Sequence, residues 1–191
     1  ALYFAMVTAQ QARASERREG GYRRAAKAAE LRSLRYQVNP HFLFNTLNSL
    51  SALVMTGKGQ AAETMIQTLS AFYRRSLAED PTGESSLDQE VALQRAYLDI
   101  ETVRFPDRLV TRIDLPEALE NAIVPGMILQ PLVENAVKYA VAPNRQPVTV
   151  TIAAREDFGR LVIEVSDDGP GAALGGKAGF GIGLANVRDR L

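Results

Sequence analysis

A short segment rich in proline, glycine and serine divides the chain into two parts with different patterns. The segment EDPTGESS (79–86) lies between two stretches of helical periodicity, and its composition is typical of a linker. Before it, apolar residues recur at three- and four-residue intervals. After it, a helical stretch is followed by segments that alternate apolar and polar residues, as strands do. We therefore expect a helical unit followed by a unit of helices and strands, which makes an α+β chain.

The first unit is predicted to be a helical hairpin. One helical pattern runs over about residues 22–54 and is interrupted at Pro40, where Asn39 can cap a restarted helix. After the turn TGKG (56–59), a second helix is expected over about 61–77. A hairpin buries only one seam between its helices, and a second copy would complete a four-helix bundle. The sequence therefore predicts a dimer.

The second unit is predicted to combine helices, strands and a glycine-rich end. Ser86 and Gln89 form a capping-box signature, so a helix is expected to begin there and to end before Pro106. Between Gly169 and Gly183 the chain holds seven of its fourteen glycines, and a helical pattern follows them. The other expected elements are strands at 109–115, 148–154 and 161–166, the last two as a hairpin, and a helix at 124–141 with Pro131 in an early turn.

Composition excludes several kinds of site. With no cysteine and one histidine, the chain has no disulfides, no thiolate catalysis, no cysteine zinc site and no histidine metal cluster. Residues 9–36 hold eight Lys or Arg against three Glu and follow the apolar ALYFAMV (1–7), which is far shorter than the roughly 20 residues that span a bilayer. Two interpretations stay open, a cytoplasmic juxtamembrane segment and a frayed helix with a solvated face. Aromatic residues are not interleaved with the basic ones, which argues against nucleic-acid binding.

The single histidine lies on the polar face of its predicted helix. At about 100° per residue, Asn45 lies on the same side as His41, and Leu47 and Val54 lie on the opposite apolar arc. A surface or capping role and a chemical role for the imidazole are both compatible with this position.

Several groups in the second unit suit a nucleotide. A glycine-rich backbone before a helix can close around phosphates, or it can be a flexible loop. Asn135 and Lys138 offer an amide oxygen for hydrated magnesium and an ammonium group for a phosphate, although solvated helix positions would look the same. DDGPG directly after a strand is typical of a turn. The order of these signals favours nucleotide binding over the separate simpler interpretations.

Five segments together resemble the LytS-type sensor histidine kinases. They are QVNPHFLFNTLNSL, YLDIETVRFPDRL, LQPLVENAVKYAV, VSDDGPG and GFGIGLANVRDRL, so the match covers roughly residues 31–191. The resemblance implies a nucleotide domain of the superfamily of gyrase, Hsp90, histidine kinases and MutL, an α/β sandwich of the GHKL or Bergerat type. It assigns residues 1–21 to a juxtamembrane signalling helix, 22–79 to the dimerisation and phosphotransfer hairpin, 80–86 to the linker and 87–191 to the ATP-binding domain.

The resemblance also implies roles for individual residues. His41 would be the phosphoacceptor, and Asn45, one turn on, would orient the ring or a water. Asn135 would help to hold Mg²⁺, Glu134 would assist the metal or a water, and Lys138 would approach the phosphates.

The resemblance assigns the two glycine motifs to adenine binding and to the ATP lid. Asp167 would accept a hydrogen bond from the adenine amino group, with Gly169 and Gly171 forming the turn. The ATP lid would contain Gly179, Gly181 and Gly183, with Asn186 nearby.

Two positions depart from the family pattern. Tyr139 stands where the family commonly has histidine, and the chain stops at Leu191, whereas the family's domain continues into further strands. We therefore expect a C-terminally incomplete fragment with an open sheet edge.

The expected function is ATP-dependent autophosphorylation on His41, followed by transfer to an aspartate of a response regulator. Phosphoryl transfer needs chiefly alignment and charge neutralisation, which ATP with Mg²⁺ and these residues would supply. The resemblance implies a homodimer, the cytoplasmic portion of an inner-membrane protein attached through a segment upstream of residue 1. The alternatives are a catalytically silent dimeric scaffold and an ATP-driven clamp or chaperone whose hydrolysis would not depend on His41.

Overall fold

The computed structural model describes residues 39–78 and 83–170. The predicted juxtamembrane helix, residues 79–82 of the linker segment, and Gly171 with the lid residues Gly179, Gly181, Gly183 and Asn186 lie outside the described residues.

Two helices joined by a tight turn form the first part, as predicted. Helix α2 spans Pro40–Met55 and helix α3 spans Gly59–Ala78. Pro40 is the first helical residue of α2, where its missing N–H costs nothing. Gly57 adopts a φ of 73°, and the N–H of Lys58 donates to the carbonyl of Leu53 at 2.8 Å, which ends α2 and reverses the chain.

The apolar face of α2 is less buried than its pattern predicts. Within α2 the buried residues are Phe42 and Thr46, whereas Leu47 and Val54 are 48% and 65% exposed. A single chain supplies neighbours to only part of this face. Leu47 and Val54, on the predicted apolar arc, are therefore not covered within the single chain.

Helix α4 begins at the predicted capping box. It spans Leu87–Arg104, the N–H of Gln89 donates to Ser86 Oγ at 3.3 Å, and the N–H of Ser86 donates to Gln89 Oε1 at 3.2 Å. Residues 84–86, placed in the linker by the sequence, instead form strand β1 (Glu84–Ser86), which pairs antiparallel with β3 (Ile123–Pro125). The described end of the predicted linker is therefore part of the second unit.

A three-stranded sheet forms the base of the second unit. Its order is β2 (Leu109–Asp114), β4 (Val148–Asp157) and β5 (Arg160–Asp167). Strand β2 is parallel to β4, and β4 pairs antiparallel with β5, with Val150 opposite Asp167. The predicted hairpin is confirmed, and Phe158 and Gly159 make its turn with positive φ angles of 49° and 75°.

The helix predicted over 124–141 begins later than expected. Helix α5 spans Gln130–Ala136 and continues as one π-helical turn, η2 (Val137–Val141), while a short 3₁₀ turn, η1, covers Glu117–Leu119. The prediction was wrong for the first residues because they pair as β3 and because Met127 adopts a left-handed φ of 58°. Pro131 lies in the first turn of α5, as expected.

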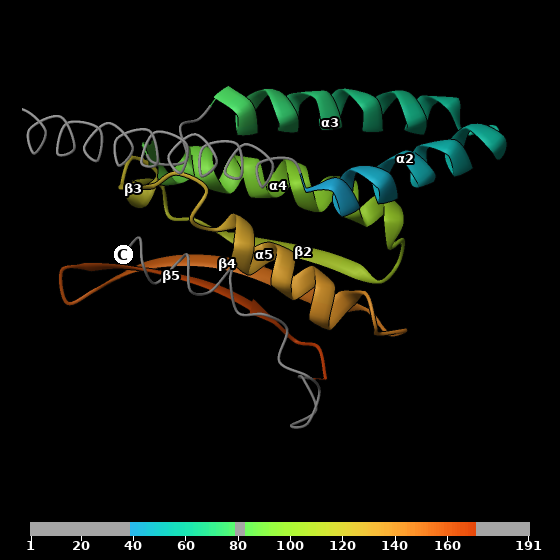
Figure 1. The fold of residues 1–191 in the computed structure, drawn as a ribbon. Coiled ribbons are helices and arrows are strands. Elements are labelled where there is room, and N and C mark those ends of the chain that lie inside the picture. The colour runs from blue at the N-terminus through green and yellow to red at the C-terminus, as the bar shows by residue number, and fades with distance from the viewer. Residues whose placement is uncertain (1–38, 79–82, 171–191) are drawn as a thin grey trace, which may run out of the picture. The chain divides into compact units, whose positions relative to one another are not determined.

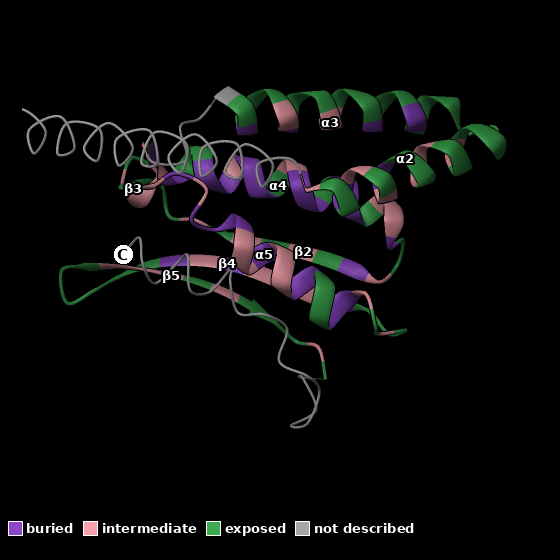
Figure 2. Cartoon of the chain, viewed as in Figure 1, coloured by how far each residue is buried: buried purple, intermediate pink, exposed green. Residues whose placement is uncertain are grey.

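Helix α4 occupies the middle of the packing in the second unit. Helices α4 and α5 lie on the same face of the three-stranded sheet (Figure 1), and α4 is buried along much of its length, whereas α3 is mostly exposed (Figure 2). No helix in the described ranges is long and apolar enough to span a bilayer. The fully buried apolar side chains include Leu87, Leu93, Leu98, Val133, Val141, Val148 and Val150.

Candidate functional site

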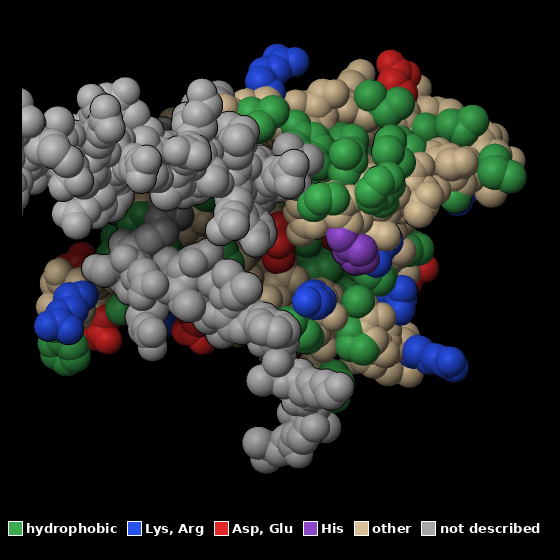
Figure 3. Space-filling view, viewed as in Figure 1, with side chains coloured by type: hydrophobic (Ala, Val, Ile, Leu, Met, Phe, Trp, Pro, Cys, Tyr) green, Lys and Arg blue, Asp and Glu red, His purple; other side chains and the backbone are tan. Residues whose placement is uncertain are grey.

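His41 lies in the first turn of α2 and its side chain is exposed (Figure 3, purple). The next residue, Phe42, is only 3% exposed, and its ring lies 4.9 Å from that of Tyr97 and 5.4 Å from that of Phe72. Phe42 therefore anchors the start of α2 in an aromatic cluster. Asn45, one turn after His41, is half-buried.

Three predicted site residues lie along α5 and its π-helical turn. Glu134 and Asn135 are half-buried near the end of α5, and Gln130 Nε2 donates to Glu134 Oε1 at 2.8 Å. Lys138 is exposed on the π-helical turn, with its Nζ 4.8 Å from the centre of the Tyr139 ring. Single π-helical turns within helices occur frequently at functional sites. Tyr139, the departure from the family pattern, thus contacts the lysine predicted to approach phosphates.

The Asp167 turn packs directly against the same helix. The N–H of Gly169 donates to Asp167 Oδ1 at 3.2 Å, which orients the carboxylate at the end of β5. A Cβ placed on Gly169 would lie 2.8 Å from the Cβ of Ala140, so only glycine allows this approach. The structure therefore brings the Asp167 motif against the helix that carries Asn135.

Gly169→Ala is expected to destabilise this contact. The added methyl group meets the side chain and backbone of Ala140, and overpacking of this kind costs about 1–3 kcal/mol of unfolding free energy. Urea denaturation measures the effect. Gly59→Ala is the matched control, because a Cβ at Gly59 meets nothing within 4 Å. Equal midpoints for the two variants would contradict the assignment of a tight contact.

Asp168 is a polar residue to which the sequence assigned no role. Its Oδ1 accepts the N–H of Thr149 at 2.6 Å, and its own N–H donates to the carbonyl of Thr149 at 3.2 Å. The bond from Thr149 lowers the pKa of Asp168 below its usual value. Asp168 thus ties the residue after β5 to the start of β4, and so fixes the position of the neighbouring Asp167.

Polar side chains form a buried stripe along α4 that sequence reasoning missed. They are spaced so that they share one face of the helix, and each is at most 4% exposed. The available signal was the spacing of these residues, which follow one another in the sequence at intervals of four, three and four positions. The members of this stripe are Glu90, Gln94, Tyr97 and Glu101.

The charge of Glu134 acts on this stripe and on α3. Burial raises the pKa of Glu101, with the Glu134 carboxylate adding to the rise and the Arg104 guanidinium, 3.4 Å away, opposing it. Burial also raises the pKa of Tyr97 and of Tyr73, and Glu134 contributes to both shifts. Glu134 therefore lies close enough to Glu101, Tyr97 and Tyr73 for its carboxylate to act on their pKa values.

The donor set around Asn135 fits magnesium bound to a nucleotide. Asn135 and Glu134 present amide and carboxylate oxygens, and Mg²⁺ is commonly held by one or two protein oxygens together with phosphates and waters. In residues 39–78 and 83–170 there is no group of three or more His, Asp or Glu side chains that could hold a metal by themselves. A magnesium ion here would therefore depend on the phosphates for its other ligands.

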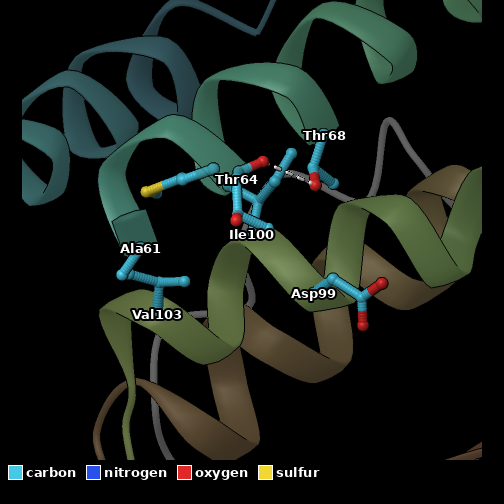
Figure 4. Close-up of a pocket in the computed structure, with 7 residues that line it drawn as sticks. Ala61, Thr64, Thr68, Asp99, Ile100 and Val103 are labelled. Atoms are coloured by element: carbon cyan, nitrogen blue, oxygen red, sulfur yellow. Dashed lines mark hydrogen bonds between the residues drawn. The ribbon is translucent and has the colours of Figure 1, made fainter. Parts of the chain in front are cut away.

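A groove of about 340 Å³ lies between α3 and α4 (Figure 4), and no predicted site residue lines it. Thr68 Oγ1 donates to the carbonyl of Thr64 along its α3 wall at 3.0 Å. On the α4 wall, burial raises the pKa of Asp99, and Arg95 opposes this rise. The lining residues are Ala61, Thr64, Met65, Thr68, Asp99, Ile100 and Val103, and none was predicted to bind a nucleotide.

Two family models match the chain. The histidine kinase model matches residues 29–109, and the model of histidine kinase-, DNA gyrase B- and HSP90-like ATPases matches residues 120–191. Sensor histidine kinase YesM of Bacillus subtilis is 34% identical over 168 residues, which cover 86% of this chain and 29% of YesM. Sensor protein LytS of Staphylococcus haemolyticus is 34% identical over 176 residues (86% and 30%), and sensor histidine kinase BtsS of Escherichia coli is 36% identical over 163 residues (85% and 29%).

This chain belongs to the LytS-type sensor histidine kinase family. The chain spans about 30% of the length of these relatives. Membership confirms the predicted fold class, a helical unit followed by a GHKL-type domain, and it confirms that the second unit is of an ATP-binding kind.

Proposed function

We propose that this histidine kinase phosphorylates itself on His41 with ATP and passes the phosphoryl group to an aspartate of a response regulator. The observation that carries the proposal is the contact of Gly169 with Ala140, which closes the Asp167 turn on the helix of Asn135. The exposure of His41 supports it further, because a phosphoacceptor must be reached by the nucleotide.

The proposed reaction is an in-line displacement. An imidazole nitrogen of His41 attacks the γ-phosphorus, the bond from that phosphorus to the bridging oxygen breaks, ADP leaves with the electron pair, and the ring proton passes to solvent. Asn45 orients the ring or a water. Neutral imidazole is nucleophilic, so a dedicated base is not required.

The residues of the second unit position the nucleotide in this proposal. Asn135 and Glu134 hold Mg²⁺, which supplies neutralisation of phosphate charge, and Lys138 approaches the phosphates. Asp167 accepts a hydrogen bond from the adenine amino group beside the turn at Gly169. The resemblance assigns Gly171 to the same motif and Gly179, Gly181, Gly183 and Asn186 to an ATP lid, and these residues lie outside the described ranges.

We further infer a homodimer in which residues 22–79 form the dimerisation and phosphotransfer hairpin and residues 87–191 the ATP-binding domain. The linker predicted at 80–86 is shortened in this proposal, because strand β1 of the second unit begins at Glu84. Support comes from large apolar side chains that α2 and α3 leave exposed in the single chain, since a second hairpin would cover them. The proposed assembly is the cytoplasmic part of a protein held to the inner membrane through a segment upstream of residue 1. The exposed side chains are Phe44, Leu47, Val54, Met55, Ile66 and Leu77.

Incubation with γ-labelled ATP and Mg²⁺ tests the function. We expect the chain to acquire label that is lost in acid and kept in base, as for phosphohistidine, and a receiver domain added afterwards should take the label up. An ATP titration that shows no binding would contradict the proposal and favour the silent scaffold.

Asn135→Ala is expected to weaken magnesium-dependent ATP binding. The substitution removes one proposed oxygen ligand of Mg²⁺. A hydrogen bond to a charged group contributes about 1.5–3 kcal/mol, and a loss of the same size lowers the affinity at least about tenfold. Titration calorimetry at several Mg²⁺ concentrations measures it. Asn121→Ala is the control, because Asn121 is exposed in the turn before β3. Unchanged affinity in Asn135→Ala would remove Asn135 from the proposed metal site.

A further inference from the structure

Glu90 connects α4 to the start of α5 over a long distance in sequence. It lies in the first turns of α4, its side chain is fully buried, and it carries the first polar group of the stripe. Glu90 Oε1 accepts the N–H of Met127, and Oε2 accepts the N–H of Leu129 at 3.5 Å. The two bonds hold both ends of the three-residue segment that precedes α5.

The start of α5 has no capping side chain of its own. Its N-cap residue is Leu129, which makes no side-chain cap, and Pro131 in the first turn has no N–H. The first N–H groups of a helix need acceptors from outside the helix, and an acidic group at this end is favoured by the helix dipole. Glu90, on another helix, supplies an acceptor for the N–H of the N-cap residue Leu129.

The segment that Glu90 holds is also strained. Met127 has a φ of 58°, a left-handed conformation that is uncommon for a residue with a side chain. Such conformations persist where the surroundings hold them, and the N–H of Met127 is the group bonded to Glu90. Helix α5 therefore begins at a position set by a distant carboxyl group.

We propose that Glu90 is a positioning residue that fixes α5, and with it Asn135, for nucleotide-bound magnesium. This inference rests on the proposed role of Asn135. Asn135 lies in the second turn of the seven-residue α5, so a shift at Leu129 is passed directly to it. Glu90 touches neither nucleotide nor metal in this proposal and acts through the helix.

Amide hydrogen exchange on the unmodified chain gives the first test. The N–H groups of Met127 and Leu129 should exchange slowly, like those within α4, because both bond to a buried carboxyl group. The N–H groups of the exposed turn at Phe158 and Gly159 give the reference for fast exchange. Exchange of Met127 and Leu129 at the reference rate would overturn the proposal.

Glu90→Gln gives the second test, with Glu84→Gln as the matched control. Glutamine keeps the volume but has one acceptor oxygen, so one of the two N–H groups must face an NH₂ group. Glu84 is exposed on β1 and next to the same part of the fold. In Glu90→Gln we expect the Mg²⁺ concentration for half-maximal ATP binding to rise about tenfold. Amide exchange in α5 should also become faster. Glu84→Gln should show neither change.

Amide exchange and the Mg²⁺ dependence of ATP binding together distinguish three cases: Glu90 positions α5, Glu90 only stabilises the fold, or the proposed function fails. A loss of folded protein with unchanged Mg²⁺ dependence per folded molecule would overturn the positioning role. If the unmodified chain and Glu84→Gln bind no ATP with Mg²⁺, the proposed function fails. In that case amide exchange alone decides whether Glu90 holds α5, and fast exchange at Met127 and Leu129 rejects it.

Discussion

Replacing His41 with glutamine is expected to abolish the incorporation of acid-labile phosphate from ATP. Glutamine keeps a polar side chain of moderate size at an exposed helix position, but its amide nitrogen is not nucleophilic, so no phosphoramidate bond can form. The expected loss is complete within the detection limit of a labelled-ATP assay, while ATP affinity measured by calorimetry stays unchanged.

Two further measurements make this result specific. Gln67→Ala, an exposed change on α3, should keep the label, and circular dichroism should show that His41→Gln is folded. Acid-labile label that persists in His41→Gln would place the phosphoacceptor elsewhere and contradict the proposed function. ATP hydrolysis that persists unchanged without label would point to the clamp or chaperone alternative.

Phe42→Ala is expected to give a large loss of stability. The Phe42 ring is 3% exposed and lies within 6.4 Å of the ring centres of Phe72, Tyr73 and Tyr97. Truncating a buried phenylalanine costs about 3–5 kcal/mol, because it removes the transfer free energy of the ring and leaves a cavity. The contacts between the rings add to this cost. Urea denaturation followed by circular dichroism measures the change.

The same helix offers a matched control two residues later. Phe44 is 66% exposed, so Phe44→Ala should change the unfolding free energy of the monomeric chain by less than about 0.5 kcal/mol. Measurement at low protein concentration keeps any effect on association out of the comparison. Similar unfolding midpoints for Phe42→Ala and Phe44→Ala would contradict the assignment of Phe42 to a packed aromatic cluster.

Local signals in the sequence predicted most of the elements. The capping box at Ser86, the start of α2 at Pro40 and the turn of the β4–β5 hairpin all depend on residues within a few positions of one another, so the sequence alone predicts them. The candidate residues His41 and Asn135 were likewise found from short motifs. The family resemblance found from those motifs is confirmed by the comparisons.

Contacts between distant segments were decided by the tertiary structure alone. Glu90 bonds to Met127 across 37 positions, and Gly169 meets Ala140 from another element. These pairings also explain why α5 begins later than predicted. Residues 123–125 form β3 and Met127 has a left-handed φ, so the helix cannot begin at residue 124 although the apolar pattern starts there. Hydrophobic periodicity predicts which face of an element is buried and where local caps fit, but it carries no information on which other element supplies the partner. Only the packed chain decides this, because there the buried carboxyl group of Glu90 meets the N–H groups of Met127 and Leu129.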